Sequence, residues 1–241
     1  MLKKISYIKS NGKRVFEEAD VVISTMPLSS LFANMTGNVP IYLRTIADGL
    51  KYRDCVIMGL CIKWPELSNG AVSIENFPEC MIYVQDPKIK LARIQVYNNW
   101  SPYLVKKKNE LWLGLEFFCK EGDDFWNMSD EDCVKFATAE LVKMGVISEN
   151  EVLDSHREKV KKAYPAYFDT YKHFDTMIKF LDTFPNLYCV GRNGQHRYNN
   201  MDHSMLTAME TAEAIKTGKK SRKDIWNVNT EKEYHEEKSG N

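Results

Sequence analysis

The stretch GRNGQHRYNNMDHSM, residues 191–205, decides how this chain is interpreted. It lies between a short apolar run, Leu187 to Val190, and a helical pattern that begins near His203. It carries two glycines, two arginines, a tyrosine and three asparagines, and almost no side chain that a core would bury. A crossing of this kind from strand to helix is typical of an anion site, because a helix start offers unpaired backbone N–H groups and a positive dipole end.

The loop residues have two interpretations. Gly191 and Gly194 would let the backbone approach a ligand closely or adopt a positive φ. Arg192 and Arg197 would add charge-assisted contacts to a phosphate. The alternative is a surface loop whose polar side chains are simply solvated, and the G-x-x-G spacing alone does not separate the two. The position between an apolar strand and an amphipathic helix favours a ligand site.

Composition limits the class of protein. The 241 residues include 33 basic and 33 acidic side chains, so a net charge of zero gives no bulk attraction to nucleic acid or to a membrane. The six cysteines are irregularly spaced, without a C-x-x-C pair, and most lie in apolar runs. That usage favours reduced core thiols in the cytoplasm over disulfides or a metal site. No apolar run approaches the roughly 18 residues of a membrane span.

The remaining pattern predicts an α+β or α/β fold in two lobes. Residues 1–25 read as short strands, with a hairpin at the Asn11-Gly12 turn. Strand-like segments from Tyr52 to Lys120, separated by turn residues, predict an antiparallel sheet of four or five strands. Helices are expected near residues 41–49, 130–144, 169–184 and 203–217. We expect the methionines to be core filler.

One face of the predicted sheet is unusually polar. Strand alternation puts Trp112, Gly114 and Glu116 on one face. The same alternation puts Arg93, Gln95 and Tyr97 together on a neighbouring segment. Arg93 and Glu116 then either line a ligand cleft or form an ordinary exposed cross-strand ion pair, which would contribute at most about 1 kcal/mol.

The 191–205 stretch resembles the carboxy-terminal flavin motif of the FAD-dependent amine oxidase and protoporphyrinogen oxidase-like superfamily, and within it the UDP-galactopyranose mutase-like branch of bacterial polysaccharide biosynthesis. That branch has a G-R-x-G-x-x-R-Y-x-x-M-D-like run. It is matched here by Gly191, Arg192, Gly194, Arg197, Tyr198, Met201 and Asp202. The segments DVVISTMPLSSL, RIQVYNNWSP, LGLEFFCKEGDDFWNMSDED and KAYPAY extend the resemblance over most of the chain.

The resemblance implies roles for these residues. Arg192 would lie near the FAD pyrophosphate, and backbone amides around Met201 to His203 near the pyrimidine edge of the flavin. Tyr198 would meet the diphosphate of a sugar nucleotide, with Arg93, Tyr97 and Glu116 nearby on the sheet. The mutases carry an acid two residues after that tyrosine, whereas this chain has Asn200. An amide supplies no negative charge, which puts mutase chemistry in doubt.

The superfamily also binds FAD through an amino-terminal G-x-G-x-x-G turn, and no glycine of this chain follows a strand with that spacing. The chain therefore reads as a carboxy-terminal portion: residues 1–50 a partial FAD-binding lobe, 51–185 a substrate-binding domain, 186–218 an FAD-contacting strand–loop–helix, and 219–241 a polar tail, either a peripheral helix or disordered. We expect an exposed sheet edge, and hence self-association or a missing FAD domain as partner.

Two functions follow as hypotheses. The first is part of an FAD-dependent oxidoreductase or mutase-like enzyme acting on a sugar nucleotide or related substrate, with the chemistry supplied by the cofactor. The second is a non-catalytic sugar-nucleotide-binding or assembly module without the dinucleotide domain. By itself the chain is expected to be inactive and to bind FAD weakly or not at all. No catalytic residue and no metal ligand is assigned.

Overall fold

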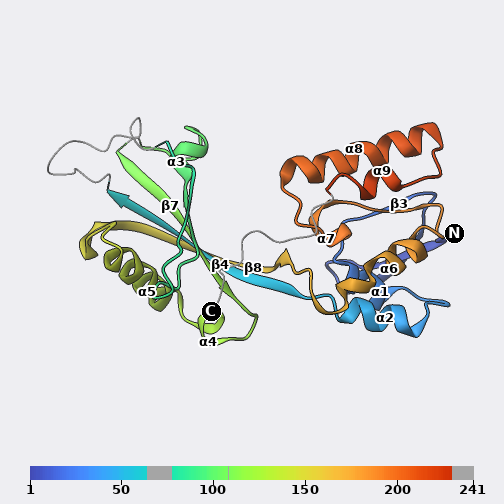
Figure 1. Ribbon diagram of the computed structural model, residues 1–241, viewed down its shortest axis with the longest axis horizontal. Coiled ribbons are helices and arrows are strands. Elements are labelled where there is room, and N and C mark those ends of the chain that lie inside the picture. Colours follow the sequence, from blue (N-terminus) through green and yellow to red (C-terminus); the bar gives the residue numbers. More distant parts are fainter. Residues whose placement is uncertain (64–77, 108, 230–241) are drawn as a thin grey trace. The chain divides into compact units, whose positions relative to one another are not determined.

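The computed structural model describes residues 1–63, 78–107 and 109–229, and these form two compact units (Figure 1). Among the described residues, one unit contains Met1–Tyr52 and residues 164–229, and the other contains those of Arg53–Ala163. The chain leaves the first unit within β4 (Tyr52–Lys63) and returns to it within β8 (Val152–Pro165). The predicted α+β class is confirmed, and residues 230–241 of the predicted tail lie outside the described residues.

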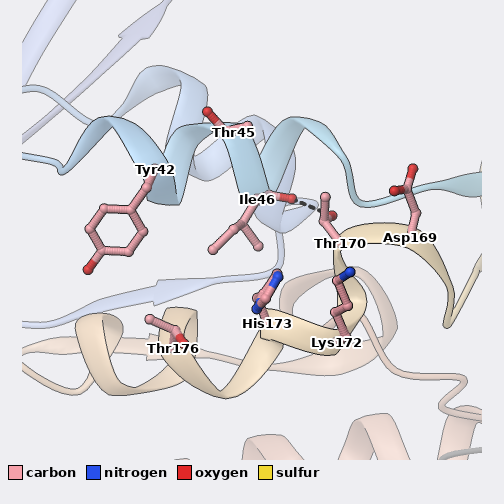
Figure 2. Close-up of a pocket in the computed structure, with 8 residues that line it drawn as sticks. All are labelled: Tyr42, Thr45, Ile46, Asp169, Thr170, Lys172, His173 and Thr176. Atoms are coloured by element: carbon pink, nitrogen blue, oxygen red, sulfur yellow. Dashed lines mark hydrogen bonds between the residues drawn. The ribbon is translucent and has the colours of Figure 1, made fainter.

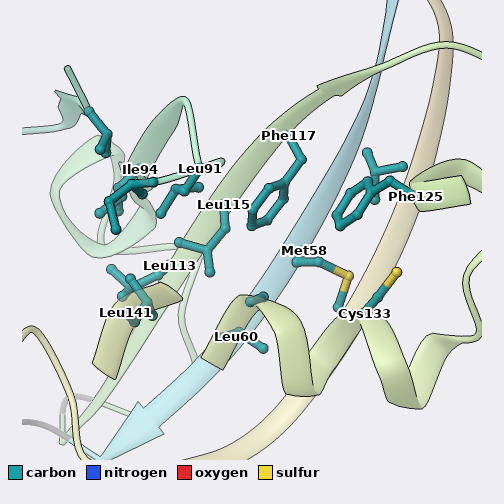
Figure 3. Packing of buried hydrophobic residues seen from close by; sticks show 14 of the residues in the cluster. Met58, Leu60, Leu91, Ile94, Leu113, Leu115, Phe117, Phe125, Cys133 and Leu141 are labelled. Atoms are coloured by element: carbon teal, nitrogen blue, oxygen red, sulfur yellow. The ribbon is translucent and has the colours of Figure 1, made fainter. Parts of the chain in front are cut away.

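The 53–163 unit is built on a five-stranded sheet in the order β5-β6-β7-β4-β8. Besides β4 and β8 it contains β5 (Met81–Tyr83), β6 (Arg93–Val96) and β7 (Glu110–Cys119), and β5–β6, β6–β7 and β7–β4 pair antiparallel. The predicted antiparallel sheet is thus confirmed. Alternate residues of β4 and β7, such as Met58, Leu115 and Phe117, point into the core on one face (Figure 3).

Helices cover that apolar face. The long helix α5 (Asp130–Lys143) contributes Cys133 and Leu141 to the core, and the short α4 (Asp124–Asn127) contributes Phe125 (Figure 3). The Ser129 side chain caps α5 by accepting from the backbone N–H of Asp132 at 3.1 Å, as predicted. The unit also contains the single turns α3 (Tyr97–Trp100) and η2 (Glu149–Glu151).

Strand β8 was missed by the sequence analysis. It is 14 residues long and rich in charged side chains, so it lacks the apolar alternation by which strands are recognised. It lies at the end of the sheet, where charged residues are common because they discourage pairing with other chains.

The other unit is centred on a parallel pair of strands, β3 (Val22–Ser24) and β9 (Leu187–Cys189). One face of β9 packs on α1 (Leu28–Asn34), α2 (Ile41–Asp48) and α6 (Phe174–Leu181), which follows η3 (Asp169–His173). Its other face packs on α8 (Met201–Thr217) and α9 (Lys223–Trp226). The prediction that the two terminal segments of the chain come together is confirmed by this pairing.

Several apolar side chains of this unit are exposed. The predicted hairpin is present as β1 (Lys4–Ile8) and β2 (Arg14–Glu18), but its Ile8 and Phe16 are exposed. Ile23 of β3 is also exposed, as are Met205 and Met209 of α8. The expectation that the methionines fill the core is therefore wrong for α8.

Within the described part of the chain, no helix is both long and apolar enough to cross a membrane. All six cysteines are free, and five of them are buried.

Candidate functional site

The strand–loop–helix crossing is more structured than a solvated loop. After β9 the chain forms α7 (Gly191–Gln195), passes through His196 in the left-handed region, and enters α8 with Asn200 as N-cap. Gly191 has a φ of +75°, and a Cβ added there would meet nothing within 4 Å. A Cβ on Gly194 would come within 2.6 Å of the Ser24 carbonyl oxygen. Gly194 therefore permits close packing of α7 on the end of β3, and Gly191 leaves open space beside the crossing.

The backbone at Tyr198 and Asn199 is held by bonds from three separate segments. The Tyr198 N–H donates to the Tyr167 hydroxyl, and the Tyr198 carbonyl accepts from Asn229 Nδ2 at 3.0 Å. The Asn199 carbonyl accepts from Arg192 Nε at 2.8 Å. This part of the loop therefore has a defined geometry rather than the many conformations of a solvated loop.

Arg192 lies against aromatic rings. Its guanidinium carbon is 4.6 Å from the ring centroid of Tyr198 and 5.4 Å from that of Tyr164. The two tyrosine rings stack, with centroids 5.7 Å apart. Cation–π contact orients the guanidinium and leaves its positive charge in place for an anion.

The start of α8 is open to solvent. Met201 and Asp202 are exposed, and the Asn200 N–H donates to His203 Nδ1 at 3.3 Å. His203 therefore caps the helix backbone. The Asn200 side chain accepts from the His203 N–H, so the amides of Met201 and Asp202 are the ones at the positive end of the helix dipole that fit an anionic or acceptor-rich ligand.

His196 is a structural residue. It is fully buried, and its Nε2 donates to the Ala166 carbonyl at 3.1 Å. Its ring meets Tyr52 edge-on, with centroids 4.7 Å apart. Burial, assisted by the charge of Arg197, lowers the pKa of His196 to about 4, although the bond to Ala166 acts in the opposite direction. The imidazole is neutral near pH 7.

In the other unit, Arg93 and Glu116 are directly opposite each other on β6 and β7, as the alternation predicted. Arg93 Nη2 lies 2.5 Å from Glu116 Oε2, and Gln95 Nε2 donates to Glu116 Oε1. The expectation of an exposed pair is wrong: the side chains are 8% and 2% exposed. Ile57 of β4 pairs with Glu116 and Tyr83 of β5 pairs with Arg93, so neighbouring strands add side chains to this face, which strand alternation within β6 and β7 does not reveal.

Tyr97 is near this pair but not on a strand. Strand β6 ends at Val96, and Tyr97 begins α3. Its ring still lies over Gly114, where a Cβ would come within 2.5 Å of the Tyr97 hydroxyl. Burial and then the Glu116 charge raise the pKa of Tyr97. Gly114 therefore accommodates the Tyr97 ring beside the ion pair.

The structure thus forms two groups of predicted site residues, one in each unit. Arg93, Glu116 and Tyr97 form one, and the 191–203 residues with Tyr198 form the other; that they share one cleft stays a prediction. Tyr164, Tyr167 and Asn229 were not predicted as site residues from the sequence. The aromatic segment KAYPAY was a usable signal for the two tyrosines, whereas Asn229 sits in a polar stretch without a recognisable pattern.

A shallow groove lies elsewhere in the first unit, between α2 and η3 (Figure 2). Tyr42 and Thr45 line one side, and Asp169 and His173 the other. Thr170 Oγ1 bridges the two walls by donating to the Ile46 carbonyl at 2.8 Å. No predicted site residue lines it. Among the described residues there is also no cluster of three His, Cys, Asp or Glu side chains that could hold a metal ion.

Comparison with solved structures shows which known proteins have a similar fold. The chain is similar to a reduced UDP-galactopyranose mutase, with a TM-score of 0.75 and 19% identity over 93% of this chain and 46% of the mutase. It is also similar to a putative protoporphyrinogen oxidase from Exiguobacterium sp. 255-15, with a TM-score of 0.55 and 14% identity over 79% of this chain and 39% of that one. No family model and no curated protein matches. The chain thus has the fold of part of these proteins and spans less than half of their length.

Proposed function

We propose that the chain is the substrate-binding and flavin-contacting part of an FAD-dependent oxidoreductase or mutase-like enzyme that acts on a sugar nucleotide or related substrate. The observation that carries the proposal is the parallel β3–β9 pair leading through the Gly191–Asn200 segment into the open start of α8. The likeness in fold to the mutase over 93% of the chain supports it. When bound, the flavin would supply the redox or nucleophilic chemistry.

The residues at the crossing fit a flavin in part. Gly191 leaves open space, and the exposed first turn of α8 offers N–H groups to an acceptor edge. Arg192, oriented by Tyr198, would neutralise a pyrophosphate. Gly194 does not fit a cofactor contact, because the end of β3 occupies the space beside it. The amino-terminal glycine turn is absent from the sequence, so we expect weak binding of FAD.

A titration with FAD tests this assignment. Amide chemical shifts are followed by NMR, because a helix-terminus contact of about 0.3–1 kcal/mol would not survive purification. We expect the amides of Arg192 and of residues 201–203 to shift, and Arg192→Ala to weaken the effect. Lys220→Ala, an exposed cation, is the control. Shifts that avoid these amides, or none at millimolar FAD, would overturn the assignment.

For the substrate, we propose that Arg93, Glu116 and Tyr97 contact the diphosphate; contact of the diphosphate with Tyr198 is a separate proposal. Arg93 is paired with Glu116 in the structure, so it would contact a ligand while keeping that partner. A charge-assisted contact of roughly 1.5–3 kcal/mol makes Arg93→Ala weaken UDP binding by several-fold or more. Arg93→Lys keeps the charge and separates loss of the contact from loss of the fold. Equal UDP affinity in the wild type and in a folded Arg93→Met, Glu116→Leu double variant would remove both residues from the site.

The same proposal includes a missing FAD-binding domain as the partner of this chain. The mutase is more than twice the length of the matched region, so its fold continues beyond what this chain spans. On this proposal the remaining part of such a fold, with the glycine turn, packs beside β3 and on α8. Exposed Ile23, Met205 and Met209 support this, because they are the apolar groups that such packing would cover.

A further inference from the structure

The segment Arg222–Asn229, called here the C-terminal clasp, contacts the Gly191–Asn200 segment, called here the ligand loop. Gln195 is fully buried and joins the two. Its Nε2 donates to the Ile225 carbonyl at 2.8 Å, and its Oε1 accepts from Asn199 Nδ2 at 3.3 Å. One side chain thus connects the backbone of the clasp to the end of the ligand loop.

A second connection starts from the clasp. Asn229 is 4% exposed, and its Nδ2 donates to the Tyr198 carbonyl. The next carbonyl along the chain, that of Asn199, is the acceptor for Arg192 Nε. The two carbonyls belong to consecutive peptide units joined at the Asn199 Cα, so only the φ and ψ of Asn199 separate them, and the bond from Asn229 limits where Arg192 finds its acceptor.

The second arginine of the loop is held by the same region. The Arg197 guanidinium lies over the Phe174 ring, 5.6 Å from its centroid. Trp226 of the clasp meets Phe174 edge-on at 6.2 Å. Ile225 and Trp226 are both buried, so the clasp is anchored by apolar side chains and does not depend on its polar bonds alone.

We propose that the C-terminal clasp positions the ligand loop for an anionic ligand, with Asn229 and Gln195 as positioning residues. They hold the Tyr198–Asn199 peptide in place, and through it they orient Arg192 before the ligand arrives. Such preorganisation raises affinity by removing the cost of ordering the loop on binding. Only the identity of the ligand, a diphosphate, rests on the proposed function.

Hydrogen exchange of the isolated chain tests the positioning without any ligand. Asn229→Ala removes the donor, and we expect exchange of the 195–200 amides to accelerate about tenfold, as loss of a stabilising hydrogen bond implies. Peptides of the 53–163 unit should not change. Asn227→Ala, an exposed asparagine of the same segment, is the matched control. Asn229→Leu, which has the same branching at Cγ but is larger and lacks the donor, replaces the alanine variant if that variant does not fold.

Binding of UDP is the second measurement. We expect Asn229→Ala to weaken UDP several-fold while the unfolding midpoint stays close to that of Asn227→Ala. If the wild type does not bind UDP but exchange accelerates, the positioning role stands and the diphosphate assignment fails. If exchange at 195–200 is unchanged in the Asn229 variants, or rises equally throughout the chain, the clasp is not a positioning element.

Discussion

The Arg93 guanidinium lies 2.5 Å from the Glu116 carboxylate, on side chains that are 8% and 2% exposed. Glu116 also accepts from Gln95, and the Tyr83 ring lies 5.7 Å from the Arg93 guanidinium carbon. Two buried charges that satisfy each other in this way are costly to separate, because removal of one leaves the other uncompensated. The pair is therefore part of the stability of its sheet, whatever it binds.

Arg93→Ala is expected to lower the free energy of unfolding by about 3–5 kcal/mol, since it leaves Glu116 buried and unpaired. Urea denaturation measures the change. Lys120→Ala, exposed at the end of β7, should stay within about 0.5 kcal/mol of the wild type. The double variant Arg93→Met, Glu116→Leu should recover most of the loss, because it removes both charges. A single variant as stable as the wild type would show that the pair is not closed in solution.

The two loop glycines should differ in their tolerance of alanine. Gly194→Ala places a methyl group 2.6 Å from the Ser24 carbonyl oxygen, so α7 or β3 must shift, at about 1–3 kcal/mol. Gly191→Ala meets no atom and costs only the strain of a positive φ, about 1 kcal/mol. Thermal unfolding of both variants makes the comparison. A greater loss at Gly191 would contradict the packing described for α7.

Sequence pattern predicted those parts of the fold that depend on local rules. The register of Arg93 with Glu116, the Ser129 cap and the β3–β9 strands all follow from alternation, capping or apolar runs. Strand β8 was not predicted, because its many charged residues interrupt the alternation of polar and apolar residues that marks a strand. The burial of Arg93 and the bond from Asn229 to Tyr198 depend on segments distant in sequence, and no local pattern contains them.

The apolar side of α8 should promote association of the isolated chain. Met205 and Met209 are one turn apart and exposed, and burial of such side chains contributes about 25 cal/mol per Å². Sedimentation velocity is expected to show concentration-dependent self-association that Met205→Glu with Met209→Glu reduces. Unfolding should change little, because neither side chain is in the core. Glu substitution at Ala212, exposed further along α8, is the control for added charge. A wild-type chain that is monomeric at high concentration would contradict this prediction.

His196 should make the first unit acid-sensitive. In the folded chain its pKa is about 4, against an ordinary value of 6.5, because the ring is buried and Arg197 disfavours a second positive charge. The unfolded chain therefore takes up this proton first as pH falls. Stability from the neutral imidazole is complete above pH 6.5 and declines toward pH 4, by on the order of 3 kcal/mol.

The variant His196→Gln separates this effect from general acid denaturation. Its amide does not titrate, and it can donate to the Ala166 carbonyl as Nε2 does. We expect it to be less stable than the wild type at pH 7.5, because glutamine fits the aromatic surroundings of Tyr52 and Phe174 less well. Between pH 6.5 and 4.5, however, its unfolding free energy should fall less steeply. His156→Gln, at an exposed position, should retain the wild-type slope. Parallel slopes for His196→Gln and the wild type would mean that folding does not lower the pKa of His196.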